Sequence, residues 1–197
     1  MHIRPAQPAD ALAIAELTRI ASGGLVDFLF DGLGISEEIP QVLANEIAAE
    51  ESAISYKKTM VAVLDGDASN PVVGAVTSFP ASEHRLTEEM EQFFPHNYLK
   101  VLEEFYQTRV ENSWFMDTLA VREEFRGQGI GGQLIAVTKQ RAKSEGFSAL
   151  SLMAWADNIG AIRLYQRQGF TSVRPVRIGE HPKLLPGRNF ILMNCPV

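Results

Sequence analysis

The chain has 197 residues, of which 46% are hydrophobic and 21% are charged, and its formal net charge is −6. This length and hydrophobic content suit one globular domain over residues 1–197. The net negative charge argues against a nucleic-acid partner, which would require a basic stripe. No stretch approaches the roughly 18 apolar residues of a membrane helix, and the N-terminus lacks the apolar run of a signal peptide. We therefore expect a cytoplasmic protein without a membrane partner.

The only cysteine is Cys195, close to the C-terminal end of the chain. One cysteine excludes an intrachain disulfide and a multi-cysteine metal site. We expect Cys195 to be structural, and we expect no bound metal.

The first half of the chain combines strand and helix patterns. Alternating or β-branched apolar runs indicate strands, and apolar residues at helical spacing indicate helices. The expected elements are a strand at 2–7, a helix at 8–22 closed by Gly23 and Gly24, a helix at 37–51, and strands at 59–64 and 72–79. The turn-rich residues 65–71 join the last two strands, which predicts an antiparallel hairpin.

The second half begins with an acidic and aromatic segment, residues 80–111, which we interpret as a helical insertion. The elements expected after it are a strand at 114–121, a helix at 130–145, a strand at 149–155, a helix at 157–168, and strands at 170–176 and 190–195. Strands and helices in this order predict a mixed α/β sheet with helices packed on it.

A glycine-rich turn lies between the strand at 114–121 and the helix that follows. Glycines allow the backbone to approach a ligand closely, and a helix N-terminus directs unpaired N–H groups toward the same place. This pattern favours a phosphate site, although a tight turn with close helix packing is the structural alternative. The turn consists of Arg126, Gly127, Gln128, Gly129, Ile130, Gly131 and Gly132.

Gly127, Gly129 and Gly132 also satisfy the dinucleotide-binding pattern, with Asp157 as its acidic residue. That alternative is weaker because residues 122–126 separate the pattern from its strand and because Asp157 lies too far along the chain. No Gly-Lys-Ser or Gly-Lys-Thr occurs, so a nucleoside-triphosphate loop is excluded.

Two segments resemble the signatures of one family, the GCN5-related N-acetyltransferases. The first is Leu119-Ala120-Val121 followed by Arg126-Gly127-Gln128-Gly129-Ile130-Gly131, which is similar to the coenzyme A motif Arg/Gln-x-x-Gly-x-Gly/Ala. The second is Asn158-x-x-Ala161-x-x-Leu164-Tyr165-x-x-x-Gly169-Phe170. Their order, with a strand between them, makes chance agreement improbable. The close resemblance covers residues 114–175.

The resemblance implies a mixed, mostly antiparallel sheet of six to seven strands flanked by helices, with the insertion at 80–111 preceding the central coenzyme-binding strand. It implies acetyl-CoA as cosubstrate, with its pantetheine arm in a V-shaped gap between the strands at 114–121 and 149–155. For Asn158, helix capping is the alternative role. The coenzyme-binding residues so implied are Leu119, Ala120, Val121, Arg126, Gly127, Gln128, Gly129, Ile130, Gly131, Gly132, Asn158 and Tyr165.

Direct acetyl transfer requires an acid for the leaving thiolate, a donor for the oxyanion and a neutral amine. The resemblance places Tyr165 as the acid and the Leu119 N–H as the oxyanion donor. A core tyrosine is the alternative for Tyr165. Asp117 lies two residues before Leu119 and is the candidate base, with an ion pair or a solvated edge as the alternative. His84, His96, glutamates of the insertion and a water chain remain open as the base.

We expect the acceptor to be a primary amine of a small cationic molecule, because the insertion combines acidic and aromatic residues. A solvated helical face is the structural alternative. The glutamates are Glu83, Glu88, Glu89, Glu91, Glu103, Glu104 and Glu111, and the aromatic residues are Phe93, Phe94, Tyr98, Phe105 and Tyr106. A coenzyme A-binding regulatory module and a peptide N-acetyltransferase remain alternatives. A homodimer and a longer acyl group are left open.

Overall fold

The computed structural model describes residues 1–66, 71–184 and 187–197. Its strands form one seven-stranded sheet in the order β1-β2-β3-β4-β5-β7-β6. All neighbouring strands are antiparallel except β4 and β5, which are parallel. The strands are β1 His2–Pro5, β2 Thr59–Val63, β3 Val72–Pro80, β4 Trp114–Val121, β5 Ala149–Trp155, β6 Thr171–Val176 and β7 Phe190–Pro196. The expected mixed, mostly antiparallel sheet is confirmed.

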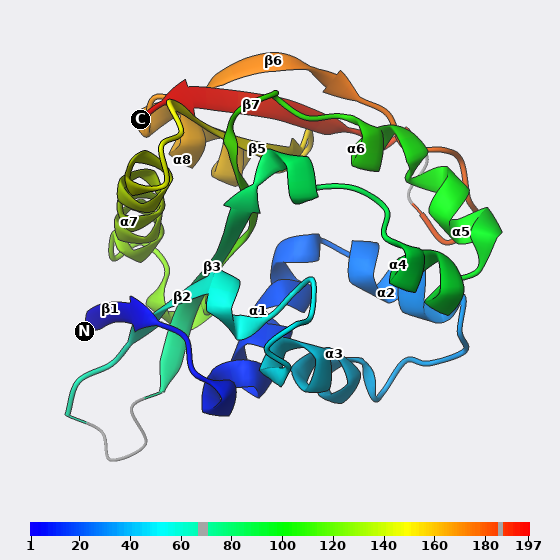
Figure 1. Ribbon diagram of the computed structural model, residues 1–197, viewed down its shortest axis with the longest axis horizontal. Helices are drawn as coiled ribbons and strands as arrows, with labels where there is room; N and C mark the ends of the chain where they lie inside the picture. Colours follow the sequence, from blue (N-terminus) through cyan, green and yellow to red (C-terminus); the bar gives the residue numbers. More distant parts are fainter. Residues whose placement is uncertain (67–70, 185–186) are drawn as a thin grey trace.

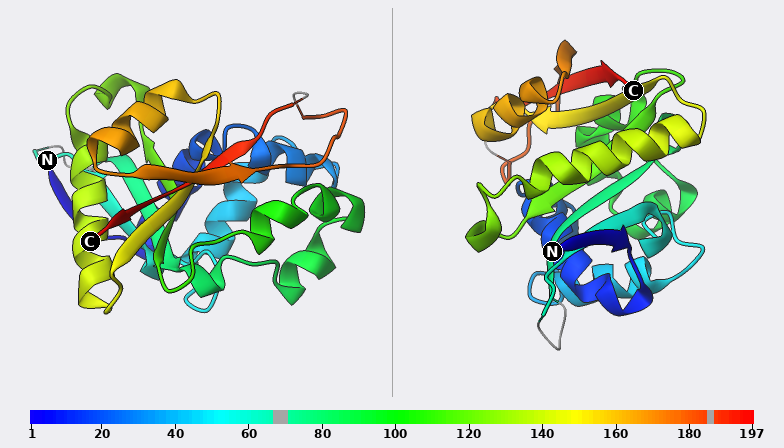
Figure 2. Two further views of the ribbon diagram at one scale, coloured as in Figure 1. Left: turned by 90° about the horizontal axis from the view of Figure 1, so that it is seen from above. Right: turned by 90° about the vertical axis from the view of Figure 1, so that its left-hand side faces the viewer.

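Helices cover both faces of this sheet (Figure 1). They are α1 Ala11–Ser22, α2 Leu25–Asp31, α3 Ile39–Ala48, α4 Glu88–Phe93, α5 His96–Val101, α6 Glu103–Gln107, α7 Ile130–Ser144 and α8 Ile159–Arg167. The views of Figure 2 show α7 lying across the strands at one end of the molecule. The insertion helices α4–α6 lie together at the opposite end. Among the described residues, no helix has the length and apolar character needed to cross a membrane.

Two hydrophobic cores lie on opposite faces of the sheet. Val61 and Ala62 are neighbours in β2, and strand alternation sends their side chains to opposite faces. Val61 packs with residues of α1–α3, whereas Ala62 packs with residues of α7. Each face of the sheet is therefore covered, which explains why β3 is buried along almost its whole length.

The sequence interpretation missed one helix. The helix α2 occupies Leu25–Asp31 between the expected first and second helices. Gly23 ends α1 in the left-handed conformation, with φ of 57°, and α2 begins two residues later. The expected turn at 65–71 includes residues 67–70, which lie outside the described part of the chain.

The parallel strands β4 and β5 pair over only part of their length. Trp114, Phe115 and Met116 pair with Leu150, Ser151 and Leu152. Beyond Met116, no described strand pairs with this side of β4, so its backbone edge is open. The expected gap between these two strands is present.

Candidate active site

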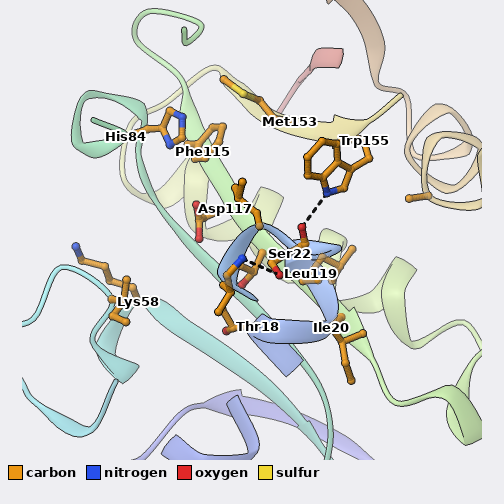
Figure 3. Close-up of a pocket in the computed structure, with 18 of the residues that line it drawn as sticks. Thr18, Ile20, Ser22, Lys58, His84, Phe115, Asp117, Leu119, Met153 and Trp155 are labelled. Carbon is orange, nitrogen blue, oxygen red and sulfur yellow. Dashed lines mark hydrogen bonds between the residues drawn. The ribbon is translucent and has the colours of Figure 1, made fainter. Parts of the chain in front are cut away.

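A cleft of about 1520 Å³ follows the gap between β4 and β5. Residues of α1 to α4, of α6, of the start of α7, and of α8 along its length complete its walls. Figure 3 shows Asp117 and Leu119 of β4 in the middle of the site, with Ser22 of α1 beside Leu119 and Trp155 of β5 above Ser22. The cleft contains every residue implied for the coenzyme except Gln128.

The N-terminal end of α7 forms one end of the cleft. Gly129 precedes the helix with φ of 81°, a conformation that side chains with a Cβ rarely adopt. The first backbone hydrogen bond of the helix joins the Gln133 amide to the Gly129 carbonyl at 3.1 Å. The preceding amides, residues 130–132, therefore have no partner inside the helix and can receive an anion. Arg126 fixes the turn to β4 by donating to the Val121 carbonyl at 3.1 Å.

Asn158 caps α8. Its side-chain oxygen accepts a 3.1 Å hydrogen bond from the Ala161 amide. The alternative role considered for Asn158, helix capping, is therefore present. The side-chain oxygen of Asn158 already accepts a hydrogen bond from the backbone of α8.

Tyr165 lies on α8, buried except for its contact with the cleft. Its ring packs against Phe170 with centroids 5.8 Å apart. No hydrogen bond joins its hydroxyl to another described residue. Burial raises the pKa of Tyr165 to about 12, because the phenolate would lose its solvation. The hydroxyl therefore keeps its proton at neutral pH and is available as a donor.

Asp117 stands at an irregularity of β4. Thr77 and Ser78 of β3 pair with Thr118 and Met116, so Asp117 is the extra residue of a β-bulge. A bulge interrupts strand alternation and redirects a side chain. Asp117 lines the cleft together with Leu119, as the sequence suggested, but the bulge rather than simple alternation sets its direction.

The Asp117 carboxylate has no hydrogen-bond or ion-pair partner in the described part of the chain. Solvent reaches its side chain, yet protein surrounds it on the walls of the cleft. This enclosure raises the pKa of Asp117 to about 6, an effect that the positive charge of Lys58 partly offsets. Asp117 is therefore mostly ionised at neutral pH and takes up a proton just below it.

Of the other candidate bases, only His84 among the histidines reaches the cleft; His96 is exposed at the start of α5. His84 is buried, and its Nε2 lies 3.0 Å from the Phe105 carbonyl. That contact requires Nε2 to carry the proton and donate it. Burial lowers the pKa of His84 to about 4, so the ring is neutral. Its packing between Phe115 and Tyr106 makes it part of the wall.

Only two of the seven glutamates expected near the acceptor line the cleft, Glu83 and Glu89. Glu83 forms an ion pair with Lys58 at 2.8 Å. Two glutamates that the sequence interpretation missed, Glu46 of α3 and Glu51 after it, also line the cleft. No pattern in the sequence could indicate them, because tertiary packing brings α3 to this wall.

Contacts across the cleft join β5 to the end of α1, and these were also missed. The indole Nε1 of Trp155 donates a 2.8 Å hydrogen bond to the Ser22 carbonyl (Figure 3). Arg188 lies over the Trp155 ring at 3.9 Å and donates to the Gly23 carbonyl at 2.6 Å. The residues involved are far apart in sequence, so local patterns carry no signal of this link.

Comparison with known proteins defines the family. A model of the "Acetyltransferase (GNAT) family" matches residues 40–170, which is more than half of the chain. The chain belongs to the GNAT acetyltransferase family. The resemblance and the expected enzyme class, an acyltransferase, are thereby confirmed at the level of the family.

Individual GNAT relatives match to different extents. The chain is 37% identical over 84 residues to "GCN5-related N-acetyltransferase 4, chloroplastic" of Arabidopsis thaliana, a match that covers 40% of this chain and 28% of that protein. A solved structure titled "The crystal structure of acetyltransferase" aligns over all of both chains with a TM-score of 0.73 and 28% identity. The NatC complex bound to Gag peptide and CoA aligns over 100% of this chain and 98% of that one, with a TM-score of 0.56 and 16% identity. This last similarity concerns the fold alone.

Proposed function

We propose that this chain transfers the acetyl group of acetyl-CoA directly to a primary amine that is positively charged in solution. One observation carries the proposal: a single cleft brings together the amides at the start of α7, the hydroxyl of Tyr165 and the unpaired carboxylate of Asp117. These are the groups that hold a phosphate, protonate a thiolate and accept a proton from an amine.

The coenzyme would bind along the gap between β4 and β5. On the side that faces β5, the edge of β4 beyond Met116 has no partner among the described strands, so the backbone groups of Leu119 and Val121 can pair with the amides of the pantetheine arm. The pyrophosphate would then lie on the amides of the turn at 126–132. A solved structure of this fold holds CoA, which supports the assignment. The residues present therefore fit acetyl-CoA.

The reaction would proceed in one transfer. The Asp117 carboxylate takes a proton from the ammonium group, and the neutral amine nitrogen attacks the carbonyl carbon of the thioester. The Leu119 N–H stabilises the negative oxygen that forms. When the C–S bond breaks, the Tyr165 hydroxyl gives its proton to the departing sulfur, and the second proton of the amine nitrogen passes to the phenolate and restores the Tyr165 hydroxyl. The products are an N-acetyl amide and free coenzyme A.

The carboxylates that line the cleft support a cationic amine. Glu46, Glu51 and Glu89 line the cleft in addition to Asp117. Lys58 is the nearby cation whose charge acts on Asp117, but it already pairs with Glu83. The five carboxylates of the cleft exceed its four cations, Lys58, Arg85, Arg126 and Arg167, by one. This small excess of negative charge attracts a cation and raises its local concentration. A peptide acceptor and a coenzyme-binding module without activity are the competing functions.

The test combines coenzyme binding with transfer. Coenzyme A should raise the melting temperature of the protein more than NAD at equal concentration. With acetyl-CoA, a panel of small amines should release free thiol faster than water or a peptide N-terminus does. Stabilisation by NAD alone would reject the coenzyme assignment. Binding of coenzyme A without thiol release from any amine or peptide would identify a binding module instead.

A further inference from the structure

A continuous series of aromatic rings surrounds the Asp117 end of the cleft, and we call it the aromatic wall. Its first part runs from β3 to the insertion. The centroids of Phe79 and Phe115 are 5.9 Å apart, those of Phe115 and His84 are 4.3 Å apart, and those of His84 and Tyr106 are 5.5 Å apart. All four residues line the cleft.

The second part of the aromatic wall continues from the insertion to β5. Phe105 lies 5.0 Å from Tyr106 and 4.8 Å from Phe190. Phe190 in turn stacks on Trp155 at 3.8 Å. These rings also line the cleft, and all of them except Tyr106 are buried. The rings of the wall therefore hold one another in place.

Asp117 lies beside this wall. It follows Phe115 by two residues on β4, and its negative charge contributes to the raised pKa of the Tyr106 hydroxyl. One unpaired carboxylate thus stands next to an extended apolar surface. The wall itself contains no carboxylate, since its only ionisable members are neutral His84 and the protonated phenol of Tyr106.

Three rings of the wall already have a face covered by a cation or by another ring. The Lys58 ammonium lies over the Phe79 ring, 5.2 Å from its centroid. One face of Trp155 is covered by Phe190 and the other by the Arg188 guanidinium. His84 is covered by Phe115 and Tyr106. A cation is attracted to an open ring face, whereas a ring edge is partly positive and favours the face of another aromatic ring. A second ammonium group of a polyamine would therefore gain little here and would lose its hydration.

We propose, on the basis of the proposed function, that the acceptor is a primary amine joined by a short aliphatic linker to a flat aromatic body. Its ammonium group lies at Asp117, and its ring packs against the aromatic wall. This assignment favours arylalkylamines over linear polyamines among the cationic amines that the cleft admits.

The test compares 2-phenylethylamine with n-butylamine and 1,4-diaminobutane at saturating acetyl-CoA. We expect kcat/KM for 2-phenylethylamine to exceed each of the others at least about tenfold, because burying the ring adds apolar contact. Equal values, or a preference for the diamine, would overturn the proposal. If no amine releases thiol, the dissociation constants of the same three amines are measured in the presence of coenzyme A. 2-Phenylethylamine should then bind at least about tenfold more tightly than each of the others. This measurement distinguishes failure of transfer from failure of recognition.

Variants locate the selectivity in the wall. Tyr106→Leu should reduce the preference for 2-phenylethylamine over n-butylamine at least about threefold, whereas Tyr106→Phe should keep it. Tyr98→Leu is the matched control, since Tyr98 is also half-buried on an insertion helix but does not line the cleft. An equal loss of preference in Tyr106→Phe or Tyr98→Leu would reject a role for the ring of Tyr106. An unchanged preference in Tyr106→Leu would do the same.

Discussion

The indole of Trp155 and the carbonyl of Ser22 are joined by a 2.8 Å hydrogen bond that crosses the cleft from β5 to the end of α1. The guanidinium of Arg188 reinforces this link, since it contacts the indole and donates both to Gly23 and to Asp157. The link lies at the end of β5, beyond the segment where β4 and β5 pair.

Gly23→Ala should destabilise the protein through this link. A Cβ on Gly23 would lie 2.7 Å from the Trp155 indole nitrogen, and the residue has φ of 57°. Gly34 has a similar φ of 70° with open space around it, so Gly34→Ala measures the backbone strain alone. We expect urea denaturation to show that Gly23→Ala loses about 1–3 kcal/mol more than Gly34→Ala. Equal losses would mean that the indole moves away freely.

Gly129→Val should weaken coenzyme A binding at least tenfold, or about 1.4 kcal/mol, by blocking the approach of the pyrophosphate to the backbone. Gly146 lies at the other end of α7 with φ of 85°, close to the 81° of Gly129, and both have open space around them. Gly146→Val therefore carries comparable backbone strain without touching the site. Calorimetric titration with coenzyme A distinguishes the two, and equal affinities would defeat the phosphate assignment. Gly131→Val provides a second variant without backbone strain, since φ is not positive there, although a Cβ would lie 3.2 Å from the end of the Leu164 side chain.

Tyr165→Phe should reduce kcat by about 10²-fold or more while leaving coenzyme affinity nearly unchanged, because it removes only the acidic proton. Stability should change little, since the hydroxyl makes no hydrogen bond to a described residue. Tyr98→Phe removes a hydroxyl outside the cleft, one that donates to Asp31, and should leave kcat unaltered. If turnover of Tyr165→Phe under saturating substrate stays within about twofold of the parent, another group protonates the thiolate.

Asp117→Asn should remove the acidic limb of the pH profile. With a pKa of about 6, the carboxylate of Asp117 is the proton acceptor only above that pH, so kcat/KM should rise through pH 6 in the parent protein. The variant should have a low kcat/KM that does not rise through pH 6. Glu91→Gln is the control outside the cleft. A parental profile that persists in Asp117→Asn would transfer the role of base to water or another group.

The same substitution should alter stability in a predictable direction. The native state holds the Asp117 proton up to about pH 6, whereas an unfolded aspartate releases it near about 3.9. The raised pKa therefore lowers stability as pH rises between these values, and the loss persists above pH 6. Asp117→Asn should be more stable than the parent at pH 7 and equally stable below pH 4. A thermal melt at each pH measures the difference.

Salt should act selectively on cationic acceptors. We expect kcat/KM of n-butylamine to fall roughly threefold or more between low salt and about 0.5 M salt, since ions screen the carboxylates of the cleft. An acceptor that is neutral at the assay pH, such as an aromatic hydrazide, should change little. Equal salt sensitivity, or a preference for an anionic acceptor, would remove the argument for charge selection.

The elements nearest the coenzyme site were the most predictable from sequence. The predicted bounds 114–121 and 149–155 coincide with β4 and β5, because apolar runs there end at clear turns. The short helix α2 was not predictable. Its two turns lie between glycines and are held by packing against the core, and so few residues cannot establish a helical period.

The acceptor end of the cleft could be predicted only in part. Asp117 was found as a cleft residue, but the bulge that directs it depends on its pairing with β3. The glutamates of the insertion were expected to act together, yet three short helices turn most of them away, including Glu104, which pairs with Arg174. The aromatic wall joins rings from five separate segments, so only the tertiary fold assembles it.

The strands β4 and β5 pair over a short segment and diverge beyond it, so the two strands enclose an angle. Three residue pairs at Trp114–Met116 form the pivot, and the link from Trp155 to Ser22 acts as a brace that fixes the opening angle. Since contacts within the protein set the angle at both ends, little rearrangement should oppose the entry of a coenzyme arm. Weakening the hydrogen bond between Trp155 and Ser22 would then change the spacing of the strands between which the cosubstrate lies.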